Sequence, residues 1–176
     1  METNKYEETS LGWLREVSGL PIQDEEWHYD YVPNLDCELR TGCLKEGPGI
    51  NMPVDPKDIV GLSYGFAYDG KIWREHLRDL KRPGSIIRMN HTLGDLKSFI
   101  DKSIHEDSGD RIMMRQIGTK FIITNGQHRS CIAKFINYPI KSATVHPVIS
   151  GLTEDELMNF IRLKTEEAQA RIFRYL

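Results

Sequence analysis

The stretch Phe121–Phe135, FIITNGQHRSCIAKF, combines the signals of a strand, a turn and a helix. It opens with apolar, largely β-branched residues, which are typical of the end of a buried strand. Asn125–Gly126 indicates a turn, because both residue types tolerate a positive φ. Ile132 and Phe135 then fit one face of a short helix, and Pro139 ends it. The stretch therefore predicts a strand, a tight turn and a helix.

Polar side chains gather where this predicted helix begins. The free backbone N–H groups and the dipole of a first helical turn favour an anion. A guanidinium can bind phosphate oxygens bidentately, and an imidazole can donate a hydrogen bond or act as a general acid. We therefore predict a phosphate site, with His128 and Arg129 as the candidate catalytic residues. Its members are Asn125, Gly126, Gln127, His128, Arg129 and Ser130.

The segment Ile123–Arg129, ITNGQHR, followed by Ile132–Ala133, resembles the signature of the ParB/sulfiredoxin superfamily. It is most similar to the DGQHR form of DndB-like proteins and ParB-like nuclease domains, and the resemblance covers residues 85–149. Gln127 stands where sulfiredoxins carry the catalytic cysteine, and an amide cannot replace that nucleophile, so sulfiredoxin activity is excluded. Asn125 replaces the usual Asp, which weakens the case for metal-dependent cutting at this residue. Cys131, one turn further along, is expected to be packed rather than reactive.

The resemblance implies binding of nucleotide or nucleic-acid phosphate at the Gly126–Arg129 turn. One interpretation is an enzyme, an NTPase, phosphotransferase or nuclease, that uses Mg²⁺ with a nucleoside triphosphate. The alternative is a non-catalytic DNA-binding, regulatory or interaction protein of the DndB-like, phage or defence-system type. The sequence leaves both open. Asn90 and His91, or instead Ser85 or Thr92, are expected to complete the pocket, and the nearby acids are Asp95, Asp101, Glu106 and Asp110.

Charge is strongly segregated along the chain, although the formal net charge is only −3. Residues 1–60 carry 13 acidic and 5 basic side chains, whereas residues 111–151 carry 6 basic side chains and no acid. An acid-free block suits a polyanion ligand, because a carboxylate would repel phosphate. Two basic surfaces are the predicted nucleic-acid contacts. The first comprises Lys71, Arg74, Arg78, Lys81 and Arg82, and the second comprises Arg111, Arg115, Lys120, Lys134 and, at its end, Lys141.

The pattern of elements predicts an α+β fold with a small mixed sheet and packed helices. Residues 1–82 are expected to form an acidic, loop-rich extension, with a helix at residues 11–19, a strand at 61–68 and a basic helix at 72–80. Residues 83–151 are expected to form the core that resembles the ParB/sulfiredoxin superfamily, beginning with a strand at Ser85–Met89. A helix at 93–100, capped by Thr92, and a hairpin across Ile117–Gly118 follow. The motif helix and a last strand at 142–149 complete this core.

Residues 152–176 are predicted to form one helix that opens with a capping box, Thr153 and Glu156. Its apolar stripe, Leu157, Met158, Ile161, Ala168 and Ile172, would pack on the core or on a second copy in a homodimer. The acidic N-terminal segment would either cover part of the basic face or bind a partner protein. The sequence does not decide between these alternatives.

Several classes of protein are excluded or disfavoured by composition. No apolar run approaches the ~20 residues of a membrane helix. The N-terminus carries no signal-peptide pattern, and three cysteines are expected to be free thiols, so a cytoplasmic location is predicted. His28, Cys37 and Cys43 lack the spacing of a zinc site, and no metal site is predicted.

Overall fold

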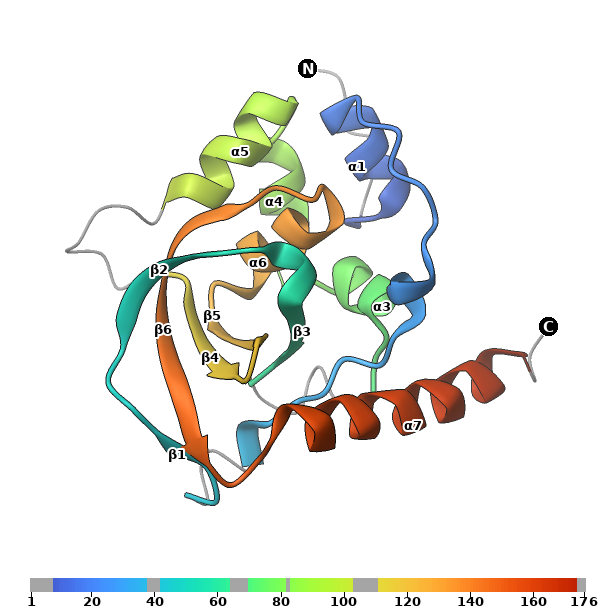
Figure 1. Cartoon of the computed structure of the whole chain (residues 1–176). Helices are drawn as coiled ribbons and strands as arrows, with labels where there is room; N and C mark the ends of the chain where they lie inside the picture. Colours follow the sequence, from blue (N-terminus) through green and yellow to red (C-terminus); the bar gives the residue numbers. More distant parts are fainter. Residues whose placement is uncertain (1–7, 38–41, 64–69, 82, 103–110, 174–176) are drawn as a thin grey trace.

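A six-stranded mixed sheet forms the centre of the molecule (Figure 1). The computed structural model describes residues 8–37, 42–63, 70–81, 83–102 and 111–173. Strands follow the order β1–β6–β4–β5–β3, and β2 also pairs with β6. β4 and β5 are antiparallel, whereas the β4–β6 and β3–β5 pairs are parallel. The strands are β1 (Lys45–Glu46), β2 (Ile50–Val54), β3 (Ile59–Leu62), β4 (Met113–Ile117), β5 (Lys120–Asn125) and β6 (Ile140–Ser150).

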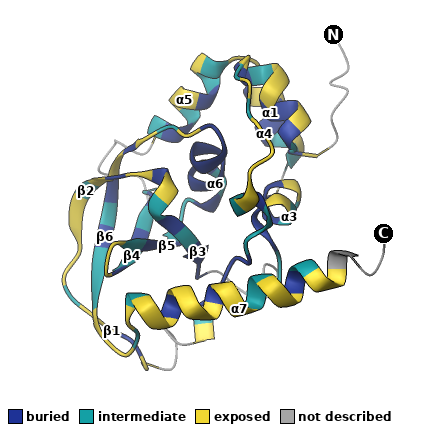
Figure 2. Cartoon of the chain, turned by 45° about the vertical axis from the view of Figure 1, so that its right-hand side comes forward, coloured by how far each residue is buried: buried dark blue, intermediate teal, exposed yellow. Residues whose placement is uncertain are grey.

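Helices complete the α+β fold and confirm the predicted class. Figure 2 shows α6 buried on all sides, whereas α7 buries only a stripe. The described residues form the α-helices α1 (Leu11–Ser18), α3 (Trp73–Arg78), α4 (Pro83–Met89), α5 (Leu93–Asp101), α6 (Gln127–Phe135) and α7 (Glu154–Phe173), and the 3₁₀ turns η1 (Glu26–Tyr29) and η2 (Pro56–Asp58).

Alternation along β5 divides the interior into two cores. Phe121 and Ile123 join the main core with α6, whereas Ile122 packs with Leu157 and Ile161 of α7. Successive strand residues point to opposite faces, so the sheet lies between α6 and α7. The predicted strand, turn and helix of the motif are confirmed as β5, Gly126 and α6.

Ser85–Met89, predicted as a strand, belongs instead to helix α4. Pro83 begins this helix, where its fixed φ is compatible with a first turn and its missing N–H is not needed. Neighbouring Ile86 and Ile87 are both buried. A short apolar run does not distinguish a strand from a buried helix turn, which explains the error.

The N-terminal region is more ordered than the predicted loop-rich extension. Residues 45–62 supply three strands to the central sheet. β2 runs along β6 at the sheet edge, and Pro53 is tolerated there because the register is irregular between Met52 and Val54. The predicted strand at residues 61–68 ends at Leu62, and residues 64–69 lie outside the described residues.

The residues predicted to end or to cap a helix are confirmed at three helices. Gly19 ends α1 with a φ of +64°. Thr92 and Asp95 form a capping box at α5, and Thr153 and Glu156 do so before α7. In the α7 stripe, Leu157, Ile161 and Ala168 are buried and Met158 is exposed, while the side chain of Ile172 lies outside the description. Within the described ranges, no helix is both long and apolar enough to cross a membrane.

Candidate functional site

The turn between β5 and α6 requires glycine. Gly126 has a φ of +80°, and a Cβ at this position would lie 2.9 Å from Ile112 Cγ1. Asn125 donates a hydrogen bond from its side-chain amide to the Arg111 carbonyl, at 2.5 Å. The asparagine therefore fixes the turn to the segment before β4, and this bond engages its side chain.

A glycine stands at the N-cap of α6. Gly126 is the N-cap residue and has no side chain to offer, and the first turn contains no acid. The first helical bond runs from the Ser130 N–H to the Gly126 carbonyl. The N–H groups of Gln127, His128 and Arg129 precede that bond, so they point out of the helix end. Such an end attracts an anion.

A pocket of about 200 Å³ lies at this helix end. Asn125, Gly126, Gln127, His128 and Arg129 line one side of it. Phe99 and Lys102, from the end of α5, line the other side. The structure thus places these five motif residues in one pocket. It adds two residues that the motif did not indicate. Ser130 is fully buried within α6 and does not line the pocket.

Arg129 is buried, with 4% of its surface accessible, although arginine is ordinarily an exposed residue. Its Nη2 lies 3.4 Å from the position that a Gly126 Cβ would take, so the guanidinium folds back over the turn. The helix direction explains this arrangement, because long helical side chains point back toward the N-terminus. Arg129 is thus buried and also lines the pocket.

The residues expected to complete the pocket have other roles. Asn90 is buried and donates to the Ile86 carbonyl, and Thr92 caps α5. Neither they nor Ser85 and His91 line the pocket. Phe99 and Lys102 do so, because α5 packs on α6. Their spacing of three residues places them on one helix face, and this is the signal that could have identified them.

Many cations of the predicted basic surfaces pair with acids, some from the same segment and others from distant segments. On the first surface, Lys71 and Arg78 pair with Asp79, and Arg74 pairs with Asp24. On the second, Arg115 pairs with Glu46, Lys120 with Asp58 and Lys141 with Asp101. Lys81 and Arg111 also interact with neighbouring groups, and Arg82 lies outside the described residues.

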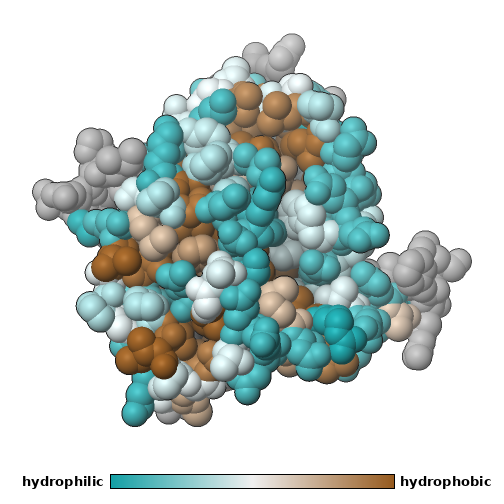
Figure 3. All heavy atoms as spheres, in the orientation of Figure 1, coloured by the Kyte–Doolittle hydropathy of each residue, from teal (hydrophilic) through white to brown (hydrophobic). Residues whose placement is uncertain are grey.

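The N-terminal segment thus covers part of the basic face. Asp24, Glu46 and Asp58 come from the acidic region, and each reaches a cation of a predicted surface. Residues 111–151 therefore lack acids in the sequence, but acids from other segments contact them in the fold. Figure 3 shows one face of the molecule in the orientation of Figure 1, with hydrophobic atoms in clusters separated by hydrophilic ones. Partner binding by this segment stays a prediction.

Lys134 was predicted to contact nucleic acid and is instead buried, with 9% of its surface accessible. It lies at the end of α6 opposite to the Gly126 turn. Cys131, between the two, is fully buried, and burial raises the pKa of its thiol. Both residues face the interior because α6 is enclosed by the sheet and by the surrounding helices.

Metal-binding side chains do not converge in the part of the chain that the structure describes. There, no group of three or more His, Cys, Asp or Glu side chains could hold an ion. Cys37 and Cys43 are exposed, and His28 is buried beside Asp24, with 3.1 Å between His28 Nδ1 and Asp24 Oδ1. Asp95 takes part in the cap of α5, and Asp101 pairs with Lys141. Glu106 and Asp110 lie outside the described residues.

Comparison of the chain with protein-family models, curated proteins and solved structures finds no match. The resemblance to the ParB/sulfiredoxin superfamily therefore rests on the Ile123–Arg129 motif and stays a prediction.

Proposed function

We propose that this protein binds the phosphate groups of a nucleotide at the N-terminus of α6. The observation that carries the proposal is the glycine turn at the start of α6, beside a pocket that the Arg129 side chain lines. Backbone N–H groups and a guanidinium that converge on one space are what phosphate recognition requires. The buried position of Arg129 strengthens such a contact, because charges interact more strongly away from water.

A compact ligand fits this arrangement better than a long nucleic acid. A pocket of about 200 Å³ accommodates a phosphate group rather than a polymer. Phe99 provides an apolar wall beside it, and Lys102 adds an exposed positive charge at the rim. Most of the cations predicted to contact DNA already have carboxylate partners. DNA would have to displace these acids before it gained those contacts.

The proposal is limited to binding. His128 lines the pocket and can donate a hydrogen bond to phosphate, which also suits a general acid. The Asn125 amide bonds to the Arg111 carbonyl and is a poor base. Turnover of a nucleoside triphosphate with Mg²⁺ is thus the enzymatic extension of the proposal. Release of inorganic phosphate, or nicking of plasmid DNA, would measure it directly.

Calorimetric titration of the whole chain with ATP, CTP and GTP, with and without Mg²⁺, tests the proposal. Arg129→Ala should lower nucleotide affinity by about 2 kcal/mol, or about 30-fold, through loss of a charge-assisted contact. Lys102→Met should lower it less, because its ammonium is exposed to water. Lys97→Met is the matched control, because Lys97 is also exposed on α5 and does not line the pocket.

Two results would overturn the proposal. One is a wild-type chain that binds none of the three nucleotides, and the other is an Arg129→Ala variant that binds them unchanged. Fluorescence anisotropy with duplex DNA at low and high salt measures the alternative. A steep loss of DNA affinity with salt would favour the DNA-binding interpretation, because it reports many phosphate contacts.

A further inference from the structure

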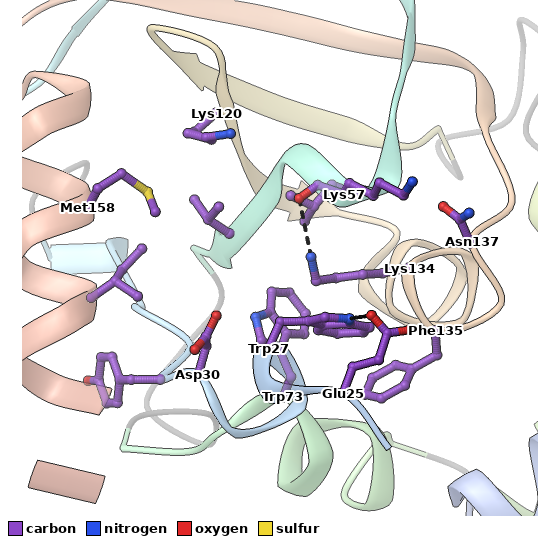
Figure 4. A pocket seen from close by; sticks show the side chains of 14 residues that line it. Glu25, Trp27, Asp30, Lys57, Trp73, Lys120, Lys134, Phe135, Asn137 and Met158 are labelled. Carbon is purple, nitrogen blue, oxygen red and sulfur yellow. Dashed lines mark hydrogen bonds between the residues drawn. The ribbon is translucent and has the colours of Figure 1, made fainter. Parts of the chain in front are cut away.

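A second and larger pocket, of about 510 Å³, lies at the opposite end of α6 (Figure 4). η1 and α3 form its floor, β3 and α6 border it, and α7 closes the remaining side. Its volume falls within the range of small-molecule sites, which is about 300–1,000 Å³. None of its residues belongs to the Gly126 turn.

Aromatic and aliphatic side chains form most of the pocket wall. Trp27, Trp73 and Phe135 lie on the side of α6, and Met158 and Ile161 project from α7. Trp27 donates from Nε1 to Glu25 Oε2 at 3.0 Å, which fixes the orientation of its indole ring. The centroids of Trp27 and Phe135 are 4.8 Å apart. A rigid apolar wall of this kind suits the apolar part of a small ligand.

Lys134 carries a buried charge with incomplete hydrogen bonding. Its Nζ lies 3.4 Å from the carbonyl oxygens of both Pro56 and Lys57, and 4.5 Å from the Trp27 ring centroid. An ammonium has three donors, and these two long bonds and the faces of the Trp27 and Trp73 rings, the latter 5.1 Å away, leave it without an anionic acceptor among the described residues. Burial lowers the pKa of this amine to about 8. An anionic group in the pocket would supply the missing acceptor.

Asp30 supplies the opposite charge on the same pocket without reaching Lys134. The two residues line the cavity together, yet they form no ion pair among those found in the described chain. The hydrogen bonds of Asp30 use its backbone, which donates to the Trp27 carbonyl and accepts from the Trp73 N–H. Burial raises the pKa of its carboxyl, and the charge of Lys134 opposes that rise. A cationic group would compensate this carboxylate.

We propose that this pocket binds a small zwitterion of the amino-acid class with an apolar side chain, held by Lys134 and Asp30 against the Trp27 wall. The ligand carboxylate accepts from the Lys134 ammonium, and the ligand ammonium donates to Asp30. The apolar side chain lies between Trp27 and Met158. A purely anionic ligand would leave the charge of Asp30 uncompensated. A purely cationic ligand would leave the charge of Lys134 uncompensated. This site is independent of the nucleotide site proposed above.

Tryptophan fluorescence of the whole chain, excited at a wavelength that phenylalanine does not absorb, tests the assignment. The probes are L-phenylalanine, phenethylamine, which lacks the carboxylate, and 3-phenylpropionate, which lacks the amine. We expect a saturable change with L-phenylalanine because Trp27 lines the pocket. Each truncated probe should bind at least about 10-fold more weakly, through loss of one charge-assisted contact. Glycine, which lacks the apolar side chain, should also bind more weakly.

Two variants show which pocket residue binds the ligand carboxylate and which binds the ligand ammonium. Lys134→Met keeps the side-chain volume and should remove the preference for L-phenylalanine over phenethylamine. Asp30→Asn should remove the preference for L-phenylalanine over 3-phenylpropionate. Lys97→Met, outside the pocket, should bind all probes as the wild type does, and thermal melting checks that each variant folds.

The proposal is overturned if the wild type binds L-phenylalanine no more tightly than its two truncated analogues, or binds none of them. This comparison uses the unmodified chain, so it decides the question even where a variant does not fold. An Lys134→Met variant that folds and keeps the wild-type preference would also overturn it. Nucleotide affinity should stay unchanged in Lys134→Met, which separates this site from the Gly126 turn.

Discussion

The two ends of α6 carry the two candidate sites, and they are built in different ways. At the N-terminal end, five consecutive residues, Asn125–Arg129, supply one side of the pocket. At the C-terminal end, the pocket draws on residues from Glu25 to Ile161, which lie on at least five elements. The first end is therefore visible as a sequence motif. The second becomes visible only when the fold brings distant segments together.

Their electrostatics differ as well. The N-terminal end relies on backbone N–H groups and a guanidinium, neither of which changes protonation at ordinary pH. Near it, however, His76 is buried and interacts with His128. The C-terminal end relies on a buried amine and a half-buried carboxyl, and burial shifts both toward their neutral forms. Acid should therefore destabilise the fold through His76, whereas alkali should stabilise it through Lys134.

Acid should produce the largest effect, through His76. Burial, followed by the charges of Lys71 and His128, lowers the pKa of this imidazole from 6.5 to about 3. The unfolded chain binds more protons than the folded chain between these two values. The free energy of unfolding should therefore fall as pH decreases from 6.5 toward 3, by roughly 5 kcal/mol for this group. Urea unfolding measured across that range tests it.

His76→Leu should flatten this acid dependence, because the titrating group is gone. His91→Gln, at an exposed position, is the control and should keep the wild-type slope. An unchanged slope in His76→Leu would show that the destabilisation by acid comes from other groups, such as His28, whose pKa burial also lowers.

Alkali should act in the opposite direction through Lys134. Burial lowers the pKa of its amine from 10.5 to about 8, so the unfolded chain binds more protons between these values. The free energy of unfolding should rise across this range by roughly 3 kcal/mol for this group. Lys134→Met should abolish the rise, and Lys97→Met should retain it. A rise of equal size in Lys134→Met would contradict the buried ammonium.

The Gly126 turn can be tested apart from any ligand. Gly126→Val introduces a β-branched residue at a φ of +80° and a Cβ 2.9 Å from Ile112. Gly70→Val is the matched control, because Gly70 has a φ of +77° and no described residue lies within 4 Å of its Cβ position. Both variants carry the same backbone strain, so their difference reports the steric clash. We expect Gly126→Val to be less stable than Gly70→Val by about 2 kcal/mol in thermal or urea unfolding.

Equal stabilities would show that Ile112 moves aside and that the turn tolerates a side chain. Nucleotide affinity should then still fall in Gly126→Val alone, because the side chain would block the approach to the first turn of α6. This second measurement separates the packing role of the glycine from its role at the site.

Short-range signals predicted much of the fold. β5, its turn and α6 follow from fifteen contiguous residues, and the capping boxes at Thr92 and Thr153 correctly located two helix starts. Each of these depends on contacts within a few residues. The strands β1 and β2 could not be predicted in this way, because their stability comes from β6, about one hundred residues away. α4 was misassigned because its apolar run is too short for periodicity to decide.

The distribution of charge along the sequence predicted less of the structure than the motif did. The absence of acids from residues 111–151 suggested an open cationic surface, yet Arg115 and Lys120 meet Glu46 and Asp58 from a distant segment. Ion pairing depends on which surfaces the fold apposes, and a linear count of charges does not contain that information. The same limit applies to Asp30 and Lys134, whose shared pocket no spacing in the sequence indicates.

The smallest expected effect concerns Arg129, and it decides how the two ends of α6 compare. Arg129→Ala removes buried aliphatic packing, which destabilises the fold, and also removes a buried charge, which offsets that loss. Alanine is moreover a good helix former. We therefore expect a net loss of only about 1 kcal/mol in urea unfolding. Arg129→Met restores the aliphatic packing without the charge and should recover most of this loss. A stable Arg129→Met that fails to bind nucleotide would assign the guanidinium to the ligand. A loss in Arg129→Met as large as that in Arg129→Ala would instead show that the guanidinium holds the fold together, and the C-terminal pocket would then be the only ligand site proposed on this helix.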